Sequence, residues 1–176
     1  MSKELAFVLS GGGSRGALQL GALYALHEAG LQPDLLIGTS IGALNGAFLA
    51  MHGYTREGLD RLKETWLYAS GMDLLPSNYF RLAVRAVLGR STHAAADRIR
   101  EFFIEQGFGP ELRFSEVGPP RLYIVSSDLN SGQPVIHGDS PGDKVLEGLL
   151  LSTALPPWVM PVRKQGRYLM DGGVVS

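Results

Sequence analysis

The chain has 176 residues, of which 45% are hydrophobic, and a formal net charge of −1. This length suits one domain with a sizeable core, and the near-neutral charge gives no electrostatic case for binding nucleic acid. Cysteine is absent, which excludes disulfides and thiolate metal sites, and the four histidines lack the spacing of metal ligands. We therefore expect a single domain over residues 1–176 with neither a metal nor a cofactor.

The chain begins with a predicted strand, a glycine-rich turn and a helix. Residues 5–9 form a strand-like run, and residues 17–29 form a helix-like stretch that stops at Gly30. The turn between them is Gly11-Gly12-Gly13-Ser14-Arg15-Gly16. A glycine-rich turn at a helix N-terminus presents several unpaired backbone N–H groups, so it will bind an anion. The anion is either a phosphate or the transient oxyanion of an acyl-transfer intermediate.

The next segment favours the oxyanion. The buried-strand run 35–37 leads into Gly38-Thr39-Ser40-Ile41-Gly42, and residues 43–51 are helix-like. A serine between strand and helix, with glycines two residues away on either side, is typical of a nucleophile elbow. A dinucleotide site would need an acid where this strand ends, and a P-loop would need a lysine in place of Ala17. A dinucleotide-binding oxidoreductase therefore stays a weaker alternative.

A more basic helical region follows. Thr55 is expected to cap a helix over residues 57–68. Residues 78–100 contain five arginines and one acidic residue, a local balance of +4. The amphipathic pattern of residues 78–90 fits a helix packed on the sheet with a solvated basic face. The alternative is a lid, or a peripheral contact with an anionic membrane.

The second half of the chain returns to strands. A strand over residues 122–125 is expected to form a hairpin with residues 134–136, and a helix over 144–153 follows. Residues 158–160 either line an acyl pocket or fill the core. A strand over 167–170 then leads to Asp171-Gly172-Gly173. By itself Asp-Gly indicates a turn, but together with Ser40 this aspartate is the best candidate for a base.

These segments, in this order, resemble the patatin-like phospholipase family. The resemblance is carried by residues 9–16, 38–43, 126–132, 152–156 and 171–173. It implies a phospholipase A-like lipid acyl hydrolase in which an aspartate takes the serine proton without a histidine. Ser40 and Asp171 match that catalytic dyad. The family's oxyanion loop corresponds to Gly11, Gly12, Gly13 and Arg15.

Two details complete the predicted site. The N–H of Ile41 is expected to be an extra oxyanion donor. Arg15 either orients the loop or attracts an anionic head group, unless it is simply a solvated arginine at a helix start. Similar proteins continue past the Asp-Gly-Gly motif, so we expect a patatin-like domain that is C-terminally truncated relative to the family.

The histidines offer an alternative to the dyad. A full triad of the α/β-hydrolase type runs serine, acid, histidine along the chain, and no histidine follows Asp171. A triad of Ser40, Asp128 and His137 would preserve that order. Loss of activity on His137→Ala would identify it.

Taken together, the patterns predict an α/β protein, a three-layer αβα arrangement with a mostly parallel central sheet. The expected function is a serine esterase on lipid or ester substrates, with a non-catalytic lipid-binding or regulatory fragment of the same fold as the alternative. The first strand begins almost directly after Met1, so we expect no signal peptide. The apolar stretch 35–51 contains polar residues and three glycines, which argues against a membrane span. The expected location is cytoplasmic, with peripheral membrane contact as an option.

Overall fold

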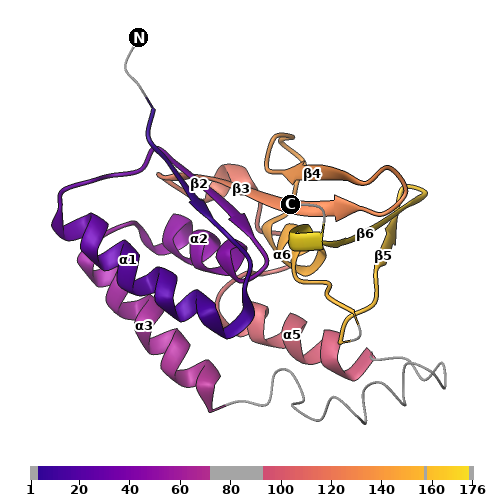
Figure 1. Cartoon of the computed structure of the whole chain (residues 1–176), viewed down its shortest axis with the longest axis horizontal. Coiled ribbons are helices and arrows are strands. Elements are labelled where there is room, and N and C mark those ends of the chain that lie inside the picture. The colour runs from indigo at the N-terminus through magenta and orange to yellow at the C-terminus, as the bar shows by residue number, and fades with distance from the viewer. Residues whose placement is uncertain (1–3, 72–92, 157, 175–176) are drawn as a thin grey trace.

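The computed structural model describes residues 4–71, 93–156 and 158–174. Its helices and strands follow in the order β1 (Ala6–Leu9), α1 (Gly16–Glu28), β2 (Leu35–Thr39), α2 (Ile41–His52), α3 (Arg56–Ser70), α5 (His93–Glu105), β3 (Arg121–Asp128), β4 (Gln133–His137), α6 (Val145–Ser152), β5 (Val162–Lys164) and β6 (Arg167–Asp171) (Figure 1). Short 3₁₀ turns cover Gly13–Arg15, Phe114–Glu116 and Gly172–Val174. The predicted basic helix at 78–90 lies outside the described residues.

The strands form one mixed sheet in the order β1-β2-β3-β6-β5, with β4 paired to β3. β1, β2 and β3 are parallel, whereas β4 and β6 run antiparallel to β3, and β5 runs antiparallel to β6. The predicted α/β class is confirmed, since the central strands are parallel and helices pack against the sheet.

The two edges of β3 explain how distant parts of the chain meet. β4 pairs with β3 along residues 124–128, so it occupies one edge there. β2 pairs with residues 121–125 of β3 and β6 with residues 126–128, so each shares part of its β3 segment with β4. Both strands must therefore pair with the edge of β3 opposite β4. β2 ends with Thr39 beside Val125, and β6 ends with Asp171 beside Ser126. The two strands therefore meet end to end along β3.

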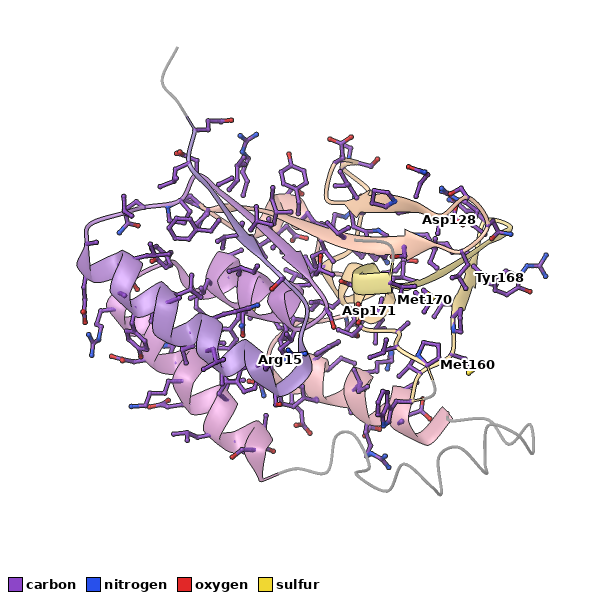
Figure 2. The ribbon with its side chains drawn as sticks, viewed as in Figure 1. Arg15, Asp128, Met160, Tyr168, Met170 and Asp171 are labelled. Carbon is purple, nitrogen blue, oxygen red and sulfur yellow. The ribbon has the colours of Figure 1, made fainter. Side chains whose placement is uncertain are left out.

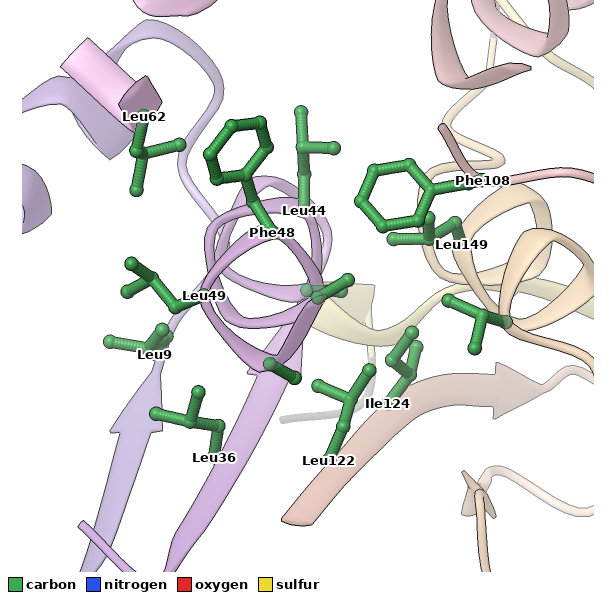
Figure 3. Close-up of a cluster of buried hydrophobic side chains, with 14 of the residues drawn as sticks. Leu9, Leu36, Leu44, Phe48, Leu49, Leu62, Phe108, Leu122, Ile124 and Leu149 are labelled. Carbon is green, nitrogen blue, oxygen red and sulfur yellow. The ribbon is translucent and has the colours of Figure 1, made fainter. Parts of the chain in front are cut away.

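The core lies between the sheet and the helices. Every residue from 42 to 50 of α2 is buried, as expected for a helix that is apolar on all sides. Figure 3 shows α2 surrounded by apolar side chains from the strands and from neighbouring helices. The fully buried members of this cluster include Leu36, Leu49, Leu62, Ile124 and Leu149. The helix that follows Ser40 is therefore fixed by packing along its whole length.

The described helices stack on one face of the sheet. α2 and α6 pack directly on the strands, and α1 and α3 pack on α2 (Figure 1). The β1–β2–β3–β4 register puts Val8 and Ile136 on the opposite face, where they are 73% and 58% exposed. Among the described helices, none is long and apolar enough to cross a membrane.

Most of the local predictions hold. The Thr55 hydroxyl accepts a hydrogen bond from the Gly58 N–H at 3.1 Å, which confirms the predicted cap of α3. The hairpin of β3 and β4 is also confirmed. β3 continues to Asp128, beyond the predicted end at residue 125, and β5 was not predicted.

Candidate active site

Ser40 occupies the turn between β2 and α2, with φ 54° and ψ −123°. A residue other than glycine in such a region costs about 1–3 kcal/mol, and the conformation persists only where the surroundings impose it. Close packing imposes it here. A Cβ on Gly42 would collide with the carbonyl of Leu9, and one on Gly38 would collide with the backbone of Ala43. The sharp strand-to-helix turn predicted from the sequence is present.

Two hydrogen bonds fasten this turn to the rest of the fold. The Ser40 N–H donates to Ser152 Oγ at 2.8 Å, and the Ser152 hydroxyl donates to the Val125 carbonyl at 2.6 Å. Ser152 is the last residue of α6 and is fully buried, whereas Ser40 is half-buried. The Ser40 backbone is thus tied to both α6 and β3.

The glycine loop lies against Ser40. The parallel pairing of β1 with β2 puts Leu9 beside Gly38, so both strands lead to the same edge of the sheet. A Cβ on Gly11 would lie 3.2 Å from Ser40 Cβ and 3.9 Å from Ser40 Oγ. Gly13 has φ 57°, a backbone conformation that glycine adopts readily. The structure therefore brings the predicted loop and the predicted nucleophile together.

The other predicted donor and the loop arginine sit at helix starts. Ile41 opens α2, so its N–H is among the first-turn donors that an α-helix leaves without an intrahelical partner. Arg15 is exposed at the end of the 3₁₀ turn Gly13–Arg15, next to the start of α1 (Figure 2).

A network of amide side chains centred on the buried Asn45 holds the glycine loop. The fully buried Asn45 donates from Nδ2 to the Gly16 carbonyl at 3.1 Å and to Gln19 Oε1 at 3.0 Å. Its Oδ1 accepts from the Trp66 Nε1–H at 3.0 Å. Gln19 in turn donates to the Ser10 carbonyl at 2.6 Å. Both ends of the loop are therefore attached to α2, the helix that Ser40 precedes.

Asp171 is buried where β6 ends (Figure 2). Its N–H donates to the Ala154 carbonyl at 2.9 Å, and its Oδ1 accepts from the Gly173 N–H at 2.8 Å. A Cβ on Gly172 would lie 2.8 Å from Thr39 Cγ2, so the residue after Asp171 packs against the residue before Ser40. The ends of β6 and β2 that carry the two predicted catalytic residues are in contact.

The alternative triad with Asp128 and His137 is wrong. The register places His137 beside Ile124, four positions before Asp128, which is about 13 Å along a strand at roughly 3.3 Å per residue. His137 Nε2 instead lies 2.7 Å from Ser126 Oγ. Asp128 accepts hydrogen bonds from the turn that follows it, namely from the Asn130 N–H and the Ser131 hydroxyl.

Some residues of the site were not predicted from the sequence. Ser152 belongs to the segment 152–156 that carries the family resemblance, but no role was inferred for it. Asn45 is a polar residue in the apolar stretch 43–51, and that contrast is the signal that could have found it. Of the residues proposed for an acyl pocket or the core, Trp158 and Val159 are half-buried, whereas Met160 is 57% exposed and does not fill the core.

The family model of the patatin-like phospholipases matches residues 7–176. The chain belongs to the patatin-like phospholipase family. Human patatin-like phospholipase domain-containing protein 6 is 32% identical over 98% of this chain and 12% of its own length. Mouse patatin-like phospholipase domain-containing protein 7 is 30% identical over 98% of this chain and 12% of its own length. Lysophospholipase nte1 of Aspergillus terreus is 26% identical over 99% and 10%, respectively.

A solved structure supports the same fold. VipD from Legionella pneumophila aligns with a TM-score of 0.56 and 19% identity, over 99% of this chain and 47% of the VipD chain. The patatin-like chain described here spans 10% to 12% of the length of the curated relatives named above. The comparisons therefore agree on the family and the fold of this chain.

Proposed function

We propose that this patatin-like chain is a serine esterase of the phospholipase A type, with Ser40 as the nucleophile and Asp171 as its base. One observation carries the proposal. β2 and β6 meet end to end on β3, and Gly172 packs against Thr39 beside the strained Ser40.

The reaction divides into two steps. Asp171 accepts the proton of Ser40 as Oγ bonds to the ester carbonyl carbon, and the alcohol then leaves with that proton as the ester C–O bond breaks. Water, deprotonated by the same carboxylate, attacks the acyl-serine, which releases the fatty acid and returns the proton to Ser40.

The glycine loop stabilises the oxyanion that forms in each step. The donors are the backbone N–H groups of Gly11, Gly12 and Gly13, joined by the N–H of Ile41 at the start of α2. Backbone donors suit this task because the amide network behind the loop fixes them before the substrate arrives. Arg15, exposed beside the loop, would meet the anionic head group of a phospholipid.

The position of Gly11 counts against the dinucleotide alternative. The side chain of Ser40 lies so close to the loop that a Cβ on Gly11 would contact it. A pyrophosphate bound at the loop would therefore compete with this side chain for space. The strand β2 also ends in Gly38 and Thr39, without the acid that holds a ribose. A cytoplasmic enzyme that meets its lipid at a membrane surface fits this proposal.

Turnover of a short-chain p-nitrophenyl ester and of lysophosphatidylcholine tests the proposal. Ser40→Ala and Asp171→Asn should each lower kcat/KM by about a thousandfold or more, because members of a catalytic unit fail together. Asp128→Asn is the matched control, since Asp128 is another buried aspartate at a strand end. Its carboxylate accepts hydrogen bonds from its own turn and pairs with Arg167.

Equal turnover by the parent chain and Ser40→Ala would refute the assignment. A folded parent chain that hydrolyses neither substrate, but binds lipid vesicles as well as Ser40→Ala does, would favour the non-catalytic lipid-binding role.

A further inference from the structure

We propose that the C-terminal end of α6 sets the position of Ser40 relative to Asp171, and that Ser152 is a positioning residue for the nucleophile. We call the Ser152 hydroxyl and the Ala154 carbonyl the α6 bracket. The predicted effect of the α6 bracket on catalysis rests on the proposed function, whereas its predicted effect on the Ser40 backbone does not.

The first arm of the α6 bracket holds the nucleophile. Ser152 Oγ accepts a hydrogen bond from the Ser40 N–H at 2.8 Å, and the Ser152 hydroxyl donates one to the Val125 carbonyl at 2.6 Å. Ser152 is fully buried, so water does not replace either bond when the hydroxyl is lost. The bond falls on the residue whose backbone holds φ 54°, where the turn most needs an external anchor.

The second arm holds the proposed base. The Ala154 carbonyl, two residues after Ser152, accepts the Asp171 N–H at 2.9 Å. One short segment therefore binds the backbone N–H of both Ser40 and Asp171. Such a segment fixes the separation of two residues that are far apart in the sequence, Ser40 after the end of β2 and Asp171 at the end of β6.

Both arms converge on β3. The Val125 carbonyl accepts the hydrogen bond of the Ser152 hydroxyl, and a Cβ on Gly172 would lie 2.5 Å from that carbonyl oxygen. Val125 also pairs with Thr39, the residue before the nucleophile. A displacement of Ser152 would therefore move the backbone next to Ser40 and the backbone next to Asp171 together.

The chemistry of the bracket requires a small side chain that donates and accepts at once. A serine hydroxyl does both. Alanine does neither, and threonine would add a methyl group at a position with no free surface. Ser152→Ala would leave the Ser40 N–H and the Val125 carbonyl without this partner and would free the turn to relax.

The test compares Ser152→Ala with Thr153→Val. Thr153 is the next residue, and its hydroxyl donates only back into α6, to the Leu149 carbonyl at 2.8 Å, so the two changes each remove one hydroxyl. The first readout is hydrogen exchange of the Ser40 amide by NMR. We expect exchange to be about tenfold faster or more in Ser152→Ala and unchanged in Thr153→Val. The Leu59 amide of α3, bonded to Thr55, reports any general loss of stability.

The second readout is ester turnover. We expect Ser152→Ala to lower kcat on the order of ten- to a hundredfold with little change in KM, because misplacing the nucleophile affects the chemical step. Thr153→Val should keep the parent value. Ser152→Cys keeps a weak thiol donor and acceptor, so it should change the exchange rate and kcat in the same direction as Ser152→Ala but by less. It replaces Ser152→Ala in the test if that variant does not fold.

The inference is overturned if the Ser40 amide exchanges at the same rate in the parent chain and in Ser152→Ala, or if Thr153→Val changes it equally. An inactive parent chain would instead refute the proposed function. The exchange measurement would still decide whether the α6 bracket holds Ser40.

Discussion

At the residue scale, Ser40 combines the hydroxyl of the proposed nucleophile with a backbone conformation that a Cβ disfavours, φ 54° and ψ −123°. The turn persists because Gly38 and Gly42 allow contacts that any larger residue would prevent, and because Ser152 binds its N–H. Strain of this kind is common at catalytic residues, since it serves the placement of a group and not the stability of the fold.

This strain predicts a difference in stability between two variants of Ser40. Ser40→Gly removes both the hydroxyl and the Cβ, whereas Ser40→Ala removes the hydroxyl and keeps the Cβ in the strained conformation. We expect the free energy of unfolding of Ser40→Gly to exceed that of Ser40→Ala by about 1 kcal/mol. Urea denaturation of both variants measures the difference. Equal stabilities would mean that the backbone at Ser40 is not strained.

The sequence allowed the positions of Ser40 and Asp171 to be predicted, because short local patterns mark a turn after a strand. The partner of Ser40 could not be predicted in this way. Ser152 lies 112 positions later, and nothing near it in the sequence says that its hydroxyl accepts a bond from the elbow. Long-range hydrogen bonds depend on the register of the sheet, which local patterns do not fix.

At the scale of elements, the start of α1 is pressed against its neighbours. A Cβ on Gly16 would lie 2.5 Å from Ile41 Cγ1 and 2.8 Å from Trp66 Cζ2. Gly21, in the same helix, is exposed and has open space around it. The two glycines therefore have different reasons to be there, and they form a natural pair for comparison.

Alanine at these two glycines should act in opposite directions. Gly16→Ala overfills the contact with α2 and α3 and should lower the free energy of unfolding by about 1–3 kcal/mol. Gly21→Ala should raise it by about 0.5–1 kcal/mol, because alanine is the better helix former. Urea titration of both variants checks this. A Gly16→Ala variant as stable as the parent would contradict the close packing at the start of α1.

The elements that the sequence missed have weak local signals for physical reasons. Ser126, Ser127 and Asp128 resemble a turn, yet they extend β3, because β4 and β6 pair with them on its two edges. All three are buried. β5 has three residues, of which two are charged, and it extends as a strand because it pairs with β6. Helices with long apolar patterns were easier to predict from the sequence, since their own composition indicates burial.

At the scale of the whole molecule, β3 determines which residues meet. β2 and β6 lie far apart in the sequence, and their shared edge of β3 brings their ends together. Predicting a parallel sheet was possible from the order of strands and helices, but the position of β6 was not, because antiparallel pairing can place a strand at several edges.

The buried His137 of β4 makes the free energy of unfolding depend on pH. Burial is the main cause that lowers the pKa of His137 below its ordinary value of 6.5. Nearby Lys164 and Arg167 act in the same direction, whereas Asp143 and Glu147 raise this pKa. The folded protein therefore favours neutral His137, and the unfolded chain takes up a proton more readily as the pH falls below 6.5.

The expected consequence is that the free energy of unfolding falls as the pH drops from above 6.5 through the lowered pKa of folded His137. The fall should be smaller in His137→Gln, which cannot take up this proton and keeps an amide to bond with Ser126. Urea unfolding at about pH 7.5 and about pH 5.5 compares the two proteins. The pKa of His52 is also lowered by burial, but it contributes equally to both and cancels. Identical pH dependence would show that His137 does not titrate differently on folding.

The central claim, that Ser40 is an activated nucleophile beside a formed oxyanion loop, is tested most directly by a fluorophosphonate probe. The measurement is the intact mass of the parent chain and of Ser40→Ala after incubation with the probe. We predict a single adduct on the parent chain and none on Ser40→Ala, because the probe needs both a reactive serine and donors for its phosphoryl oxygen. A folded parent chain without an adduct, or an adduct that persists in Ser40→Ala, would contradict the claim.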